Sequence, residues 1–283
     1  MKKLILLCLV MAFHGIYAQE TFPVNGVPDE RSGHYAFTNA TIFVDYQTKL
    51  ENATLIIKDG KVTAVGTGIS IPKGAITVNL EGKYIYPALV DPYSNYGLPE
   101  VSTSRSRGKP QYESSNKGPY GWNDAIRSTY NASEEFALNE KEAEGLRKAG
   151  FGAVNTFSPD GIMRGTSLFT NLSDAPVQDA VLSDKVAAHY SFSKGTSKQE
   201  YPGSIMGVVA LLRQTYYDAA WYRTQGSAEQ VNLSLEAFND VQGLPQVFEA
   251  NGGKLRVLLA DQVGDEFGAV SYTHLTLPTI LRV

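Results

Sequence analysis

A group of polar side chains that could do chemistry follows a short apolar segment in YIYPALVDPYSNYG, residues 84–97. The segment begins like a buried strand and becomes polar at Asp91, Tyr93 and Asn95. Enzymes with α/β folds place their working groups at the ends of such strands. The Asn95 carbonyl suits a hard cation better than zinc. A neutral Tyr is a poor metal ligand, since its reference pKa is about 10. We interpret this stretch as the rim of a site.

Other candidate side chains stand near predicted strand ends. Asp160 and Arg164, in SPDGIMRG, could line a pocket and contact a substrate. The favoured interpretation is that Asp160 is a turn residue and that Arg164 is solvated or structural. Glu249 ends the short strand predicted at residues 246–250. His189 alternates with apolar residues in VAAHYSF, which favours a hydrogen-bonded structural histidine over a metal ligand.

Composition narrows the classes of function. The 283 residues carry a formal net charge of -4 without a basic block, which excludes nucleic acid as the expected partner. The hydrophobic content of 43% is enough for one large domain or two smaller ones. The sequence contains no G-x-S-x-G, P-loop or H-E-x-x-H motif.

The N-terminus, MKKLILLCLVMAFHGIYAQE, has the pattern of a signal peptide at residues 1–19. Two lysines precede an apolar run that is too short to span a membrane. Signal removal would take away Cys8, the single cysteine, and leave a mature chain without a thiolate. We therefore expect export to the periplasm or the medium, no membrane span in the mature chain, and a linker at residues 20–34.

The elements that would position these side chains change in type along the chain. Short strands over residues 35–86 include a hairpin at Asp59-Gly60 and predict a small β domain. A loop at residues 97–125 is expected to be partly ordered. Residues 87–270 then alternate strands and helices, which predicts an α/β fold with a parallel barrel or open sheet. One helix begins with Asn139 as its cap and Glu142 in a capping box.

Residues 37–95 resemble the opening of the amidohydrolase superfamily. The similar segments are AFTNATIFVD, ENATLIIKDGKVTAVGTG and IPKGAITVNLEGKYIYPALVD, and LPQVFEANGG resembles a later strand of the same family. The resemblance implies a β-sandwich-like composite domain, of which residues 35–86 would be part, followed by a (β/α)8 TIM-type barrel. A complete barrel takes about 250 residues, so residues 87–270 would form an incomplete one.

The family resemblance also implies metal-dependent hydrolysis of C–N bonds other than peptide bonds. Asp91 matches the family Asp of the first barrel strand, but the two His positions after it hold Tyr93 and Asn95, and the later His position holds Glu249. The family uses zinc or a similar divalent ion, and we expect no metal in this segment. We therefore expect this segment to be a non-catalytic part of a longer exported protein. Its expected partner is the missing C-terminal part of the same polypeptide, and binding of a small-molecule substrate stays possible.

Two alternatives remain open. One is an active hydrolase with an atypical metal site, in which Asp91 and Glu249 act with ligands beyond this sequence. The other is a module that binds glycans or surface polymers, suggested by a Tyr-rich loop and by the 16 tyrosines of the chain.

The last segment, SYTHLTLPTILRV at residues 271–283, alternates well enough to pass for a further barrel strand with His274 as a metal ligand. It also resembles a translated sequencing adaptor, and Pro278 interrupts it. We therefore predict that residues 271–283 are a non-native tail.

Overall fold

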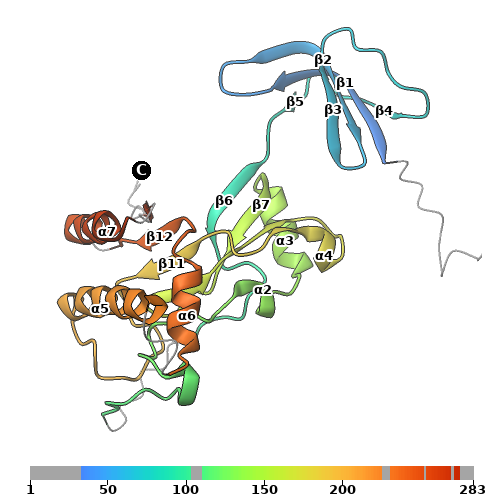
Figure 1. Cartoon of the computed structure of the whole chain (residues 1–283). Helices are drawn as coiled ribbons and strands as arrows, with labels where there is room; N and C mark the ends of the chain where they lie inside the picture. Colours follow the sequence, from blue (N-terminus) through green and yellow to red (C-terminus); the bar gives the residue numbers. More distant parts are fainter. Residues whose placement is uncertain (1–32, 103–109, 225–229, 252, 269–270, 275–283) are drawn as a thin grey trace, which may run out of the picture. The chain divides into compact units, whose positions relative to one another are not determined.

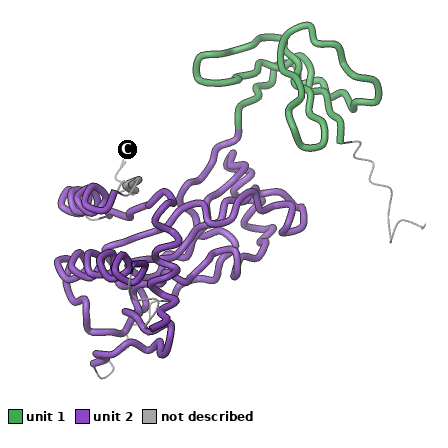
Figure 2. The backbone as a smooth tube through the Cα atoms, in the orientation of Figure 1, with its two compact units in different colours: residues 1–87 green, residues 88–283 purple. Residues whose placement is uncertain are grey.

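The chain forms two compact units, residues 1–87 and 88–283 (Figure 2). The computed structural model describes residues 33–102, 110–224, 230–251, 253–268 and 271–274, the last of these by their backbone. The predicted signal peptide with Cys8, linker residues 20–32 and tail residues 275–283 lie outside these ranges. The predictions made for them therefore stay predictions.

The first unit contains one five-stranded sheet with the order β3-β2-β1-β4, in which β5 also pairs with β1 (Figure 1). The strands are β1 (His34–Phe43), β2 (Lys49–Lys58), β3 (Lys61–Gly66), β4 (Ile76–Asn79) and β5 (Tyr84–Ile85). β1 pairs antiparallel with β2 on one side, and parallel with β4 and then β5 on the other. Within residues 33–87 the structure shows this single sheet and not the two layers of the expected sandwich.

The hairpin between β2 and β3 is confirmed. Asp59 and Gly60 both have positive φ values, 50° and 74°, as a two-residue turn of the kind favoured in hairpins requires. The register sets Lys58 opposite Lys61 on either side of this turn. Ala40, Ile42 and Ala53 form the small buried core of the unit.

The second unit contains two four-stranded sheets, with the orders β10-β9-β7-β6 and β13-β12-β11-β8. The strands are β6 (Leu89–Ser94), β7 (Phe151–Thr156), β8 (Met163–Thr166), β9 (Leu168–Asn171), β10 (Val181–Ser183), β11 (Ala188–Ser191), β12 (Gln246–Glu249) and β13 (Ser271–His274). β6 is parallel to β7, and β11, β12 and β13 are parallel to one another. These pairings follow the expected alternation of strands and helices.

Strands β8, β9 and β10 depart from that alternation. β8 runs antiparallel to β11, and β9 runs antiparallel to both β7 and β10. The chain passes directly from β8 to β9 through Ser167, so this pair of strands joins the two sheets. The unit is a mixed α/β fold, and a closed barrel is not seen among the described residues. The sequence did not predict these strands because each has only three or four residues and no regular alternation.

The helices of the second unit are divided between its two sheets. They are α2 (Ala132–Glu135), α3 (Glu140–Lys148), α4 (Val177–Ala180), α5 (Ile205–Thr224), α6 (Leu233–Asp240) and α7 (Lys254–Phe267), with a 3-10 turn η1 (Gly118–Tyr120). The predicted cap of α3 is confirmed, since Asn139 accepts a hydrogen bond from the Glu142 backbone N–H and donates to its carboxylate. The largest core joins α5, α6 and α7 to β8, β11 and β12. No helix in the described part of the chain is long and apolar enough to span a bilayer.

The backbone of residues 271–274 continues the second sheet. β13 pairs in parallel with β12, with Glu249 opposite His274. Residues 271–274 therefore form a further strand, which is one of the two interpretations that the sequence offered for residues 271–283. The non-native origin of residues 271–283 stays a prediction.

Candidate functional site

The rim predicted at residues 91–95 lies at the end of β6. Asp91 Oδ1 accepts a hydrogen bond from the Tyr93 backbone N–H at 2.9 Å. β6 ends at Ser94, and the Asn95 carbonyl then accepts from Leu98 N in a turn. Asn95 is exposed, whereas Tyr93 is half-buried. The two positions that hold histidines in the family motif therefore differ in burial here.

Tyr93 instead meets two residues that the sequence singled out elsewhere. Arg164 of β8 donates from Nη1 to Tyr93 Oη at 2.9 Å. The Nη2 atom of the same guanidinium lies 2.5 Å from Glu249 Oε2, at the end of β12. The Arg164 side chain is only 6% exposed and that of Glu249 is 23% exposed, so the ion pair is largely shielded from water. We call Tyr93, Arg164 and Glu249 the strand-end cluster.

His189 and Asn155 lie beside this cluster, and sequence reasoning missed them as a group. The His189 ring in β11 stacks on Phe157, with centroids 3.8 Å apart, and the Phe157 ring meets Tyr93 edge to face at 4.6 Å. His189 Nε2 lies 3.3 Å from Asn155 Nδ2, which also donates to the Pro92 carbonyl. A buried histidine held by a hydrogen bond and a stacked ring is the structural histidine that the sequence favoured. The alternation in VAAHYSF signalled its burial but not its neighbours.

The electrostatics of the cluster leave its net charge near zero. Burial raises the pKa of the Tyr93 phenol to about 12, although Arg164 opposes the shift, so the phenol stays neutral. Burial also acts to raise the pKa of Glu249. The Arg164 charge and hydrogen bonds from Tyr93, Arg164 and Asn251 outweigh it, and the pKa falls below its usual value of 4.5. Glu249 is therefore ionised at neutral pH and compensated by Arg164.

The donor set does not fit a divalent metal. The guanidinium of Arg164 already holds the Glu249 carboxylate, and the Tyr93 phenol keeps its proton. A metal ion would have to displace Arg164 and would be repelled by its charge. Among the described residues, no group of three or more His, Cys, Asp or Glu side chains is placed to hold a metal ion.

Asp160, which was predicted to share a pocket with Arg164, has other partners. Its carboxylate lies 2.8 Å from Arg127 Nη1 and accepts hydrogen bonds from the Thr196 backbone N–H and hydroxyl, each at 2.7 Å. Asp160 therefore fixes the loop that follows β11, in agreement with the favoured interpretation of a turn residue. Of the three candidate pocket residues, only Arg164 belongs to the strand-end cluster.

The loop predicted at residues 97–125 is described over residues 97–102 and 110–125. Asp124 is its anchor, because its carboxylate accepts hydrogen bonds from Gln111 and from the hydroxyls of Ser114 and Ser115. The Asp124 backbone N–H donates to Gln199 at 2.7 Å. The loop is thereby tied to the segment that precedes α5.

Comparisons with known proteins identify the fold. No family model matches this sequence, and a search of curated proteins found no match. An amidohydrolase from Thermotoga maritima MSB8 superposes with a TM-score of 0.65 at 20% identity, over 84% of this chain and 63% of the other. A Xaa-Pro dipeptidase with bound methionine is aligned with a TM-score of 0.39 at 12% identity, over 86% of this chain and 56% of the other. The chain therefore spans less than two thirds of these structures, and it shares the fold of the Thermotoga amidohydrolase.

Proposed function

We propose that this chain is an amidohydrolase-like part of a longer exported protein, and that this part does not catalyse metal-dependent hydrolysis. The observation that carries the proposal is the Arg164–Glu249 ion pair, at 2.5 Å. In the family chemistry a metal lowers the pKa of bound water from about 15.7 to about 7. The strand-end cluster has the guanidinium of Arg164 in place of a metal ion. A guanidinium does not coordinate water and so does not turn it into a nucleophile as a metal ion does.

The geometry supports a structural role for the cluster. Tyr93, Arg164 and Glu249 come from β6, β8 and β12, which belong to two different sheets. The hydrogen bond and the ion pair of Arg164 join these strand ends, as a shared metal ion would in the family. The cluster thus stabilises the arrangement of strands without supplying a reactive group.

The proposed partner is the remaining C-terminal part of the same polypeptide. The chain covers 63% of the Thermotoga amidohydrolase, which is consistent with further elements beyond this sequence. Leu255 and Leu258 on α7, and Leu89 and Val90 on β6, are exposed apolar side chains that such elements would cover. A small-molecule substrate would then be bound by the whole polypeptide.

Metal analysis of the full chain tests the proposal. The protein is incubated with zinc, dialysed extensively and measured by inductively coupled plasma mass spectrometry, and we expect substoichiometric zinc. Amide, imide and cyclic ureide substrates should show no turnover in the same samples.

The matched variants are Glu249→Gln and Glu266→Gln, since Glu266 forms a comparable ion pair with Arg213 on the surface, at 2.7 Å. Stoichiometric zinc that survives dialysis, and that Glu249→Gln removes but Glu266→Gln does not, would contradict the proposal. That result would support the alternative of an atypical hydrolase site built on Asp91 and Glu249.

A further inference from the structure

The two tryptophans of the chain, Trp122 and Trp221, line the same cavity although they are far apart in the sequence. The cavity has a volume of about 540 Å3, within the range of about 300–1,000 Å3 that is typical of small-molecule sites. It lies in the second unit beside the contact between α5 and α6, the two helices labelled in Figure 1. None of its described lining residues belongs to the strand-end cluster. Trp122 also packs against the main core, but the exposed ring of Trp221 has no role in the fold or in the proposed function described above.

One face of α5 supplies three of the described lining residues. Asp218, Trp221 and Tyr222 are spaced at i, i+3 and i+4, so their side chains lie on the same side of the helix. The Tyr222 hydroxyl accepts a hydrogen bond from Asn232 N at 3.1 Å, which fixes the segment entering α6 against α5. The Trp122 indole N–H donates to Thr215 of α5 at 3.2 Å. The walls are therefore held in place without a ligand, which lowers the entropic cost of binding.

The chemistry of the lining favours a neutral, hydroxyl-rich ligand. Trp221 is 53% exposed, so a large part of its apolar surface is open to a ligand. The face of an indole carries partial negative charge and attracts the C–H groups of a sugar ring. Asp218 accepts hydrogen bonds from hydroxyls, and Gln230 can both donate and accept. None of the described lining residues is cationic, which disfavours phosphates and other anions.

A second hollow adjoins the first, because the two share lining residues. It has a volume of about 320 Å3 and shares Gly121 and Trp122 with the larger cavity. Its walls include Gln214 of α5, one helical turn before Asp218. Gln214, Asp218 and Trp221 therefore form a continuous stripe along α5, with Trp122 standing between the two hollows. Such a groove has room for more than one sugar ring.

We propose that these two hollows bind a neutral oligosaccharide. Trp221 stacks on one ring, Asp218 and Gln230 bind its hydroxyls, and Trp122 separates this subsite from the one beside Gln214. The proposal is independent of the strand-end cluster and of any hydrolase activity. It also goes beyond the glycan-binding alternative drawn from the sequence. That alternative rested on tyrosine content, whereas this proposal rests on Trp122, which lies in the same loop, together with Asp218 and Trp221 of α5.

Intrinsic tryptophan fluorescence of the full chain tests the proposal, because both tryptophans report on this groove. The probes are glucose, galactose, N-acetylglucosamine, maltose, cellobiose and chitobiose, with tetramethylammonium and AMP as the cationic and anionic comparisons. We expect a saturable change in emission with at least one disaccharide, at millimolar or lower concentration. The corresponding monosaccharide should bind more weakly, because it fills one subsite.

Variants locate the site. Trp221→Ala and Asp218→Ala should each weaken binding of that disaccharide about tenfold or more, measured by isothermal titration calorimetry. Met206→Ala, at an exposed position elsewhere on α5, should leave the affinity unchanged. Circular dichroism spectra matching those of the wild type would show that the variants are folded.

Three results would overturn the proposal. The first is no response to any sugar of the panel. The second is a sugar response that Trp221→Ala and Asp218→Ala leave intact, because the ligand would then bind elsewhere. The third is tight binding of tetramethylammonium or AMP in place of sugars, which would assign the groove to an organic cation or to a nucleotide.

Discussion

At the scale of single residues, the Arg164–Glu249 ion pair is largely buried and lies beside Tyr93 of the predicted rim. Side-chain exposures of 6% and 23% place the pair in a region where water screens charges poorly. In such a setting, loss of one partner costs far more than the net contribution of the intact pair. The pair is therefore a sensitive place to perturb the fold.

We predict that Arg164→Met lowers the free energy of unfolding by about 3–5 kcal/mol, because it leaves the Glu249 carboxylate without its cation. The double variant Arg164→Met/Glu249→Gln should recover part of that loss. The surface pair Arg213–Glu266 provides the control, and Arg213→Met should cost only about 0–1 kcal/mol. Urea denaturation measures all three variants, and equal costs for Arg164→Met and Arg213→Met would show that the buried pair has no special role.

A second prediction concerns acid stability. The pKa of Glu249 is lowered from 4.5, so the folded state binds its proton less readily than the unfolded state does. The resulting stabilisation is complete above the unfolded pKa and is lost as the pH falls through the folded pKa. The difference in unfolding free energy between wild type and Glu249→Gln should therefore shrink on acidification from neutral pH to about pH 3. A difference that stays constant over this range would show that Glu249 does not titrate with a lowered pKa.

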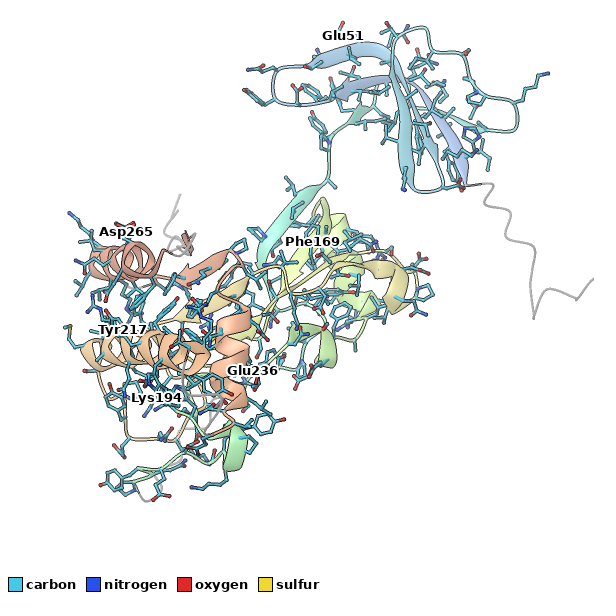
Figure 3. All side chains as sticks on the ribbon, in the orientation of Figure 1. Glu51, Phe169, Lys194, Tyr217, Glu236 and Asp265 are labelled. Atoms are coloured by element: carbon cyan, nitrogen blue, oxygen red, sulfur yellow. The ribbon has the colours of Figure 1, made fainter. Side chains whose placement is uncertain are left out.

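At the scale of elements, β8 decides where Arg164 lies. Gly165 in this strand has a φ of 77°, which L side chains rarely adopt. A Cβ atom there would overlap the Tyr130 carbonyl, which accepts a hydrogen bond from Thr166 N at 3.0 Å. The strand that carries Arg164 thus depends on a glycine next to it. Figure 3 draws the described side chains on the ribbon, with Phe169 of the next strand, β9, labelled.

We therefore predict that Gly165→Ala destabilises the protein by about 2 kcal/mol or more, through both backbone strain and overlap with Tyr130. Gly243→Ala is the matched control, because a Cβ at that position has open space around it. It should change the unfolding free energy by no more than about 0.5 kcal/mol. Thermal unfolding followed by circular dichroism compares the two, and a neutral Gly165→Ala would mean that β8 tolerates a different path.

At the scale of the whole molecule, the chain has two compact units with separate cores. The core of the first unit is small, centred on Ala40, Ile42 and Ala53. The second unit contains two larger buried clusters, one of which includes Leu212, Phe238 of α6 and Phe248 of β12. Cores of such different size should differ in thermal stability.

We predict two transitions in differential scanning calorimetry of the full chain. Ile42→Ala should lower the transition temperature of the first unit only, and Leu212→Ala that of the second unit only. Each substitution should cost its own unit about 2–5 kcal/mol of unfolding free energy. Both side chains are buried in their own unit, so each variant is the control for the other. A single transition that both variants shift would show that the units unfold together.

The sequence by itself determined the turns and helix caps, because these features depend on residues that are close together in the chain. The turn at Asp59-Gly60 and the Asn139 cap were predicted because their chemistry acts over a few residues. The spacing of Ile205, Val208, Val209, Leu212 and Tyr216 likewise predicts a helix from the sequence, and the structure shows it as α5, Ile205–Thr224. The family resemblance of residues 37–95 gave the fold class, which the similarity to the Thermotoga amidohydrolase supports.

Only the tertiary structure decided which polar side chains meet. From the sequence, Tyr93, Arg164 and Glu249 were separate candidates. Their contacts depend on how β6, β8 and β12 are placed relative to one another. The short antiparallel strands have no periodic pattern from which that placement could be predicted. The same holds for Trp122 and Trp221, which share a cavity because a loop packs on α5. Side-chain types and local turns are properties of the sequence by itself, whereas contacts between distant segments require the chain to have folded, since packing of the whole core sets them.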